Sequence, residues 1–255
     1  MELFHRDLGG AGLPPLVILH GILGSSRNWQ TAGRDLAVRY HVWALDLRNH
    51  GGSPHAQEMN YDVMVGDVLA WLDARGLGRV TLLGHSMGGK VAMRLACRHP
   101  ERVERLVVVD IAPRDYSFGG KQRKEFAAMN GLEPAGLRSR AEAEARLEAA
   151  VPDWALRKFL LTNLEREGEG WRWSINLPAL TEALPVLEKN SLAPADRFAG
   201  PALFIVGGKS AYVQPGDEGA ILRHFPAARI ETIRESGHDP HMQARAEFVR
   251  LVRAE

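Results

Sequence analysis

The sequence predicts an α/β fold, with a mostly parallel sheet covered by helices, and two observations carry that prediction. Short runs of apolar residues recur along the chain, which is typical of parallel strands buried on both faces. Segments with apolar residues at helical spacing lie between them. The predicted strands are residues 16–19, 42–45, 80–83, 106–109, 202–206 and 229–233.

Helical segments separate these strands. Residues 61–75 carry apolar side chains close to every 3.6 positions, and residues 87–99 do the same until Pro100 ends the pattern. The last two strands are followed by plausible helices at 217–224 and 242–253. Strands that alternate with helices favour right-handed crossovers between parallel strands.

This alternation is interrupted in the middle of the chain. Residues 114–190 contain no comparable apolar run and are rich in helix-forming residues, as in the segment 141–150. We therefore expect an α/β core made of residues 1–113 and 191–255, with residues 114–190 inserted as a helical cap.

The composition narrows the possible partners and locations. The 32 basic and 31 acidic residues nearly cancel, which argues against nucleic acid or a membrane surface as the main partner. Cys97 is the only cysteine, so neither an internal disulfide nor a cysteine-based zinc site is expected. Since no signal peptide or membrane-spanning run is recognisable, the expected location is the cytoplasm, with an organelle matrix as the alternative.

One short motif suggests a nucleophile. The segment 84–88 reads Gly-His-Ser-Met-Gly, which matches the G-x-S-x-G pattern of a nucleophile elbow. The pattern alone is weak, but here it follows a predicted strand and opens a predicted helix. Glycines flank such a serine because side chains would clash with the neighbouring strand and helix. The sequence therefore predicts Ser86 as the nucleophile.

A serine nucleophile needs an oxyanion hole. One donor should be the backbone N–H of Met87, the residue after the serine. The other should come from the glycine-containing loop 20–24 after the first predicted strand. We favour the N–H of Ile22 as this second donor, with that of Leu23 as the alternative.

The serine also needs a base and an acid that orients the base. The base should follow the last strand, where His238 lies beside Gly237; His241 is the alternative. Asp110 ends the strand next to the nucleophile and is the predicted acid. The strand 202–206 is followed by no carboxylate until Asp217, which is the alternative acid.

With these motifs in place, the sequence resembles the α/β-hydrolase-fold serine hydrolases, and more narrowly a group of small esterases within them. The segments that carry the resemblance are His20-Gly21, 46–53, 84–90, 110–113 and Gly237-His238. The resemblance implies an eight-stranded sheet with the cap inserted after the sixth strand. It also implies hydrolysis of small-molecule carboxylic esters with short or medium acyl groups, without a cofactor or a metal ion. Asp239-Pro240 departs from the bulkier aromatic residue expected after His238.

The cap should cover the site and supply an apolar substrate pocket. About half of its aromatic candidates are expected to pack inside the cap instead. Lys90 could additionally steer an anionic group of the substrate. The candidate pocket residues are Leu23, Lys90, Phe118, Phe126, Met129, Trp154, Phe159 and Trp173.

Other functions remain open at this point. The same three residues could hydrolyse thioesters or carbon–carbon bonds, or catalyse perhydrolysis. The fold could also belong to a ligand-binding protein without turnover, although the presence of Ser86, Asp110 and His238 argues against this. The sequence does not indicate an oligomeric state.

Overall fold

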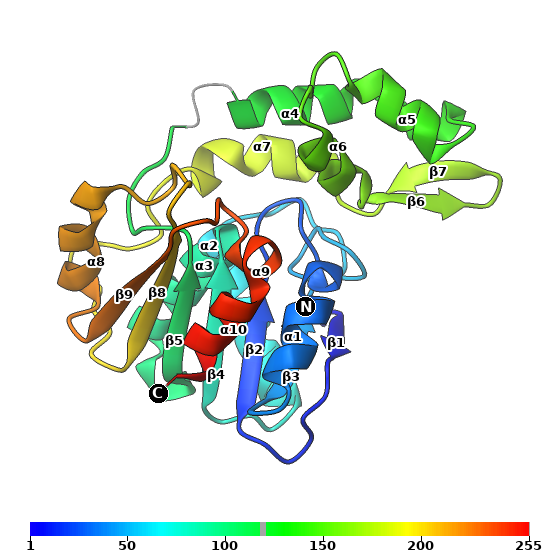
Figure 1. The fold of residues 1–255 in the computed structure, drawn as a ribbon. Coiled ribbons are helices and arrows are strands. Elements are labelled where there is room, and N and C mark those ends of the chain that lie inside the picture. Colours follow the sequence, from blue (N-terminus) through cyan, green and yellow to red (C-terminus); the bar gives the residue numbers. More distant parts are fainter. Residues whose placement is uncertain (118–120, 255) are drawn as a thin grey trace.

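The computed structural model describes residues 1–117 and 121–254. A seven-stranded sheet forms its centre, in the order β1-β3-β2-β4-β5-β8-β9 (Figure 1). All neighbouring strands pair in parallel except β1, which is antiparallel to β3. The strands are β1 (His5–Asp7), β2 (Pro15–Leu19), β3 (His41–Leu45), β4 (Val80–His85), β5 (Val103–Val109), β8 (Ala202–Gly207) and β9 (Ala228–Ile233).

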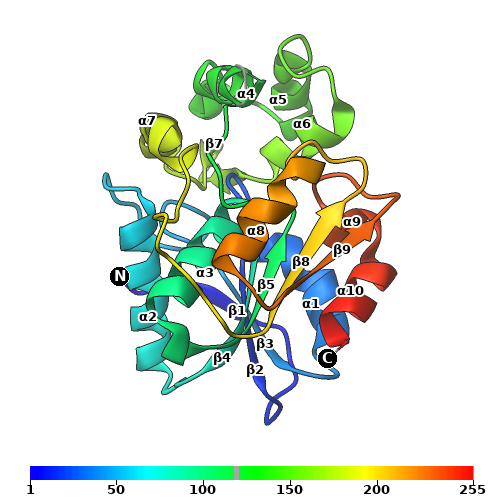
Figure 2. The ribbon, with the colours of Figure 1, turned by 90° about the vertical axis from the view of Figure 1, so that its left-hand side faces the viewer.

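Helices cover both faces of this sheet, so the sheet lies between α2 and α3 on one side and α1 and α10 on the other (Figure 2). The apolar strand runs fit this arrangement because successive side chains point to opposite faces. In β2, Leu19 packs into the cluster on the α3 side, whereas its neighbour Ile18 packs on the α1 side. The helices of this part are α1 (Gln30–Leu36), α2 (Tyr61–Ala74), α3 (Met87–Arg98), α8 (Glu218–His224), α9 (Pro240–Gln243) and α10 (Arg245–Arg253).

The cap segment, residues 114–190, lies beyond the carboxyl ends of the parallel strands (Figures 1 and 2). Within it, α4 packs against α7, and α5 packs against α6. Its elements are α4 (Lys121–Asn130), α5 (Arg140–Leu147), α6 (Trp154–Leu161), β6 (Leu164–Glu167), β7 (Gly170–Trp173) and α7 (Leu177–Leu187). Short 3₁₀ helices complete the fold: η1 (Ser26–Trp29), η2 (Pro100–Arg102), η3 (Pro134–Gly136) and η4 (Pro215–Asp217).

The six predicted strands and the helices at 61–75 and 87–99 are confirmed to within a few residues. Two details taken from the resemblance are wrong. The described sheet has seven strands, because residues 1–14 supply only the short β1, and the cap therefore follows the fifth strand in the chain. The cap is also not wholly helical, since β6 and β7 form an antiparallel hairpin. None of the helices in the described part of the chain is long and apolar enough to cross a membrane.

Candidate active site

Ser86 lies on the turn between β4 and α3 and has a strained backbone. Its φ of 52° and ψ of −118° fall in a region that L-residues rarely adopt. The flanking glycines are required for steric reasons. A Cβ atom on Gly84 would lie less than 3.0 Å from the backbone of Gly88, and a Cβ on Gly88 would lie equally close to the backbone of Leu19. The two glycines of the motif are therefore needed for this turn to form.

This crowding leads to a stability prediction. Gly88→Ala should destabilise the fold by about 3 kcal/mol, because the new methyl group meets rigid backbone. Gly66 in α2 provides a matched control, since it is also a helical glycine but nothing lies within 4 Å of its added Cβ. Gly66→Ala should stabilise the protein by about 0.8 kcal/mol through helix propensity. Urea unfolding measures both, and equal effects of the two variants would contradict the steric reading.

Asp110 and His238 are brought together at the same edge of the sheet. The His238 Nδ1 and Asp110 Oδ2 atoms are 2.7 Å apart, although the residues are 128 positions apart in the chain. Asp110 directly follows β5, is buried, and has a positive φ of 49°. The alternative acid and the alternative base are bound to other residues. Asp217 accepts hydrogen bonds from Arg114 Nε and the Gln214 N–H, and His241 stacks on Trp29.

Ser210 is a site residue that the sequence reasoning missed. Its hydroxyl donates to Asp110 Oδ2, and the Gly207 N–H donates to Oδ1 at 2.9 Å. The carboxylate is thus fixed by the segment after β8, where no carboxylate stands in this chain. The absence of a carboxylate after β8 could have pointed to Ser210. A serine at that place can donate a hydrogen bond to a carboxylate on the neighbouring strand. The Tyr212 ring, two residues on, stacks on the His238 ring with centroids 3.6 Å apart.

The geometry distinguishes the two candidate oxyanion donors. The Leu23 N–H is already used, because it donates to His50 Nε2 at 3.2 Å. Burial, with a smaller effect from His20, lowers the pKa of His50 to about 3, so its ring is neutral and can accept this bond. Among the described residues the N–H groups of Ile22 and Met87 have no hydrogen-bond acceptor, and both residues line the same cavity as Ser86. Ile22 is therefore the better candidate, and Leu23 is not available.

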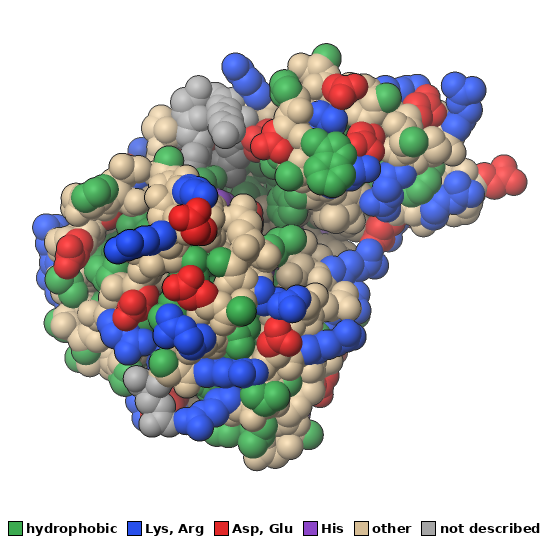
Figure 3. Space-filling model, viewed as in Figure 1, with side chains coloured by type: hydrophobic (Ala, Val, Ile, Leu, Met, Phe, Trp, Pro, Cys, Tyr) green, Lys and Arg blue, Asp and Glu red, His purple; other side chains and the backbone are tan. Residues whose placement is uncertain are grey.

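On the surface, a hollow with apolar side chains separates the cap from the rest of the molecule (Figure 3). A cavity of about 30 Å³ opens beside Ser86. This volume holds a water molecule or two. An ester substrate therefore requires its walls to move. The lining residues are Ile22, Tyr61, Ser86, Met87, Lys90, Ile111, Tyr116, Leu184, Leu187, Glu188 and Tyr212.

Lys90 is the one predicted pocket residue, among the described ones, that lines this cavity, but it is already engaged. Its ammonium donates to the carbonyl oxygens of Leu187, Glu188 and Lys189 at 3.2, 3.3 and 2.6 Å. These carbonyls end α7, where the helix dipole favours a cation. Burial lowers the pKa of Lys90 to about 7. In its protonated form Lys90 has three N–H donors, and these three carbonyls accept them in this conformation. The expected role in steering an anionic substrate stays a prediction, and it would require Lys90 to leave these carbonyls.

The remaining predicted pocket residues do not line the cavity. Phe126 and Met129 are buried among other apolar side chains, and Leu23 is buried as well. Trp173 and Phe159 are partly buried against the same cluster. Trp154 is 63% exposed, and Phe118 lies outside the described residues.

Comparison with known proteins identifies the family. A profile of the α/β hydrolase fold matches residues 14–244. The chain is 39% identical over 252 residues to the sn-1-specific diacylglycerol lipase ABHD11 of Mus musculus, covering 96% of this chain and 81% of that protein. It is 35% identical over 239 residues to esterase YbfF of Escherichia coli, covering 94% and 91%.

A solved structure of a marine microorganism esterase superposes with a TM-score of 0.96 at 35% identity, covering 99% of this chain and 98% of that one. The superposition covers nearly the whole of both chains, so the two proteins share one fold. The chain therefore belongs to the α/β hydrolase fold family.

Proposed function

We propose that this protein is a serine esterase that hydrolyses small-molecule carboxylic esters through an acyl-enzyme on Ser86. The observation that carries the proposal is the Asp110–His238 pair, joined at 2.7 Å beside a serine on a strained elbow. Tyr212 lies near both His238 and Ser86, because its ring stacks on that of His238 and it lines the cavity beside Ser86. The names of the esterase and lipase relatives support the same activity.

In this mechanism the Ser86 hydroxyl attacks the ester carbonyl while His238 Nε2 accepts its proton. Asp110 keeps the other imidazole proton on Nδ1 and stabilises the imidazolium that forms. The N–H groups of Met87 and Ile22 bind the developing oxyanion, each contributing about 3 kcal/mol. His238 then protonates the leaving alcohol, and a water molecule hydrolyses the acyl-enzyme by the same steps.

The lining of the cavity supports esters with short or medium acyl groups. Ile22, Ile111, Leu184 and Leu187 offer apolar surface beside Ser86, and the free volume is small. Longer acyl chains require a larger movement of α7, which carries two of these leucines. The single cysteine, Cys97, fits the reducing cytoplasm that we propose as the location.

A fluorophosphonate probe tests the nucleophile, and a series of p-nitrophenyl esters tests the substrate class. We expect the probe to modify Ser86 alone, as read from the mass of the modified peptide. We expect kcat/KM to be highest for short and medium acyl groups and to fall for long ones. Absence of labelling would instead favour a ligand-binding protein, whereas labelling with turnover only of thioesters would change the substrate class.

A further inference from the structure

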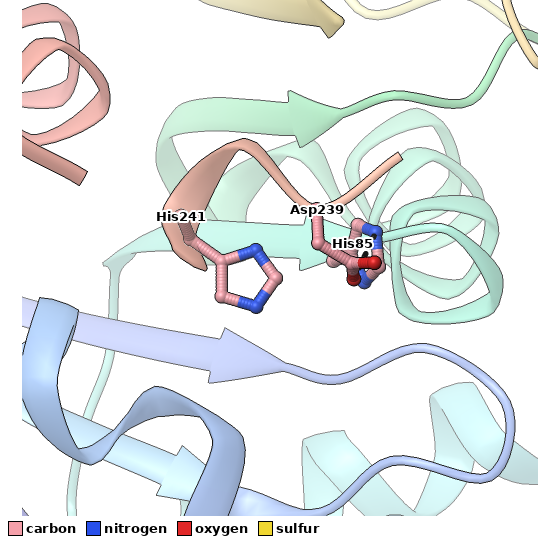
Figure 4. Close-up of side chains that lie close together, drawn as sticks. All are labelled: His85, Asp239 and His241. Carbon is pink, nitrogen blue, oxygen red and sulfur yellow. Dashed lines mark ion pairs between the residues drawn. The ribbon is translucent and has the colours of Figure 1, made fainter. Parts of the chain in front are cut away.

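Two histidines and an aspartate lie close together near the proposed catalytic histidine, and Figure 4 shows these three side chains. His85 is the last residue of β4, Asp239 directly precedes α9, and His241 lies in the first turn of α9. One nitrogen or oxygen atom of each lies within 4.8 Å of the other two. We call these three residues the His85–Asp239–His241 cluster. Asp239 stands where the resemblance leads one to expect a bulkier aromatic residue.

Both imidazoles of the cluster are buried. A neutral imidazole nitrogen is the ligand that such a site supplies. His241 is also held in place, because its ring stacks on Trp29 with centroids 4.0 Å apart and an interplanar angle of 8°.

His241 has an unsatisfied nitrogen. Its Nδ1 is buried, yet it has no hydrogen-bond partner among the described residues, and the whole side chain is only 3% exposed. Leaving such a group unpaired costs about 1–3 kcal/mol. A bound cation recovers that free energy, so this atom points to a ligand more directly than the proximity of the three residues does.

We propose that the His85–Asp239–His241 cluster binds a divalent transition-metal ion, with Zn²⁺ the best match, and that the bound ion inhibits the enzyme. Two imidazoles and one carboxylate form a known type of zinc ligand set, with bonds of about 2.0–2.2 Å. Tetrahedral ligand atoms at such bond lengths lie about 3.4 Å apart, so the cluster must contract by roughly an ångström. The Asp239 side chain is 40% exposed, which gives the ion a route from solvent.

Inhibition follows from how the cluster contacts His238. His85 Nε2 donates to the backbone carbonyl of His238 at 2.8 Å and lies 3.7 Å from Asp239 Oδ1. Because one nitrogen cannot hold both a proton and a metal ion, coordination through Nε2 breaks this hydrogen bond. The His85 and His238 rings are 4.7 Å apart, so the ion also opposes the positive charge that His238 gains in the transition state. This second part of the proposal rests on the proposed esterase function, whereas binding does not.

Binding is tested without reference to activity. Protein freed of metal with EDTA is titrated with Co²⁺, and we expect the intense visible absorption of a tetrahedral or five-coordinate cobalt site, which Zn²⁺ then displaces. Asp239→Asn and His241→Phe should each weaken Zn²⁺ binding by roughly 100-fold; phenylalanine retains an aromatic ring against Trp29. Glu235→Gln is the matched control, since this carboxylate also lies between β9 and α9, is 83% exposed, and pairs with Lys209.

Inhibition is tested by titrating Zn²⁺ during hydrolysis of a p-nitrophenyl ester, with each variant compared with its own metal-free rate. Zn²⁺ should inhibit the parent protein and Glu235→Gln equally, EDTA should reverse this, and Asp239→Asn should need roughly 100-fold more Zn²⁺. Because Asp239 is partly exposed, Asp239→Asn keeps the test decisive even where His241→Phe does not fold. Absence of the cobalt spectrum overturns the proposal. Equal Zn²⁺ affinity of the parent protein and Asp239→Asn also overturns it, because the ion then binds at another site.

Discussion

Ser86→Ala should lower kcat for ester hydrolysis by roughly 10⁶-fold while leaving the protein folded. The loss is large because the nucleophile, the base and its orienting acid act as one unit, so the remaining members cannot replace the serine. Alanine carries the same backbone restrictions as serine, so the strained φ of 52° is unchanged in cost. The oxyanion donors remain in place, and a residual rate above that in water is expected from them.

Steady-state kinetics with a p-nitrophenyl ester measures this effect, and a thermal melt shows whether the fold is intact. The fluorophosphonate probe should no longer modify the variant. Hydrolysis within a factor of ten of the parent rate, in a folded and pure sample, would show that the chemistry does not pass through Ser86.

Asp110→Asn should lower kcat by about 10⁴-fold, as in the serine-protease triad. The carboxylate oxygen Oδ2 accepts hydrogen bonds from His238 Nδ1 and the Ser210 hydroxyl. An amide that places its NH₂ there offers no acceptor to Nδ1–H and favours the wrong imidazole tautomer. Asparagine tolerates the positive φ of 49° at this position, so the effect should lie in catalysis and not in folding.

Two further variants test whether the loss of kcat in Asp110→Asn is specific to Asp110. Asp217→Asn should affect kcat far less, because Asp217 pairs with Arg114 and makes no contact with His238 among the described residues. Ser210→Ala removes one of the donors to Asp110 and should cost roughly tenfold. If Asp217→Asn proves the more damaging change, then Asp110 is not the orienting acid.

The parts of this protein that the sequence could predict are those encoded by neighbouring residues. The strands appear as local apolar runs, and Ser86 and Asp110 each lie directly after such a run. His238 could be placed because it follows the last strand, whose carboxyl end meets those of the other parallel strands. The fold class and the candidate triad could therefore be predicted from short segments of sequence, together with the rule that the carboxyl ends of parallel strands meet at one edge of the sheet.

The rest depends on contacts between distant segments. The cavity wall contains Tyr61, Tyr116 and Tyr212, which come from α2, from the start of the cap and from the segment after β8. No local pattern indicates that these rings meet. The β6–β7 hairpin escaped detection because its strands are short and carry charged residues, so they show no apolar run.

The engagement of Lys90 has a consequence for how substrates are admitted. Lys90 lies one helical turn after Ser86 on α3, and its ammonium donates to the carbonyls of Leu187, Glu188 and Lys189, at and just beyond the end of α7. The leucines of α7 that wall the cavity thus share one anchor with the helix that presents the nucleophile. Any displacement of α7 that enlarges the cavity pulls on this anchor. Access to the site and alignment of the nucleophile are therefore coupled in part through the Lys90 side chain.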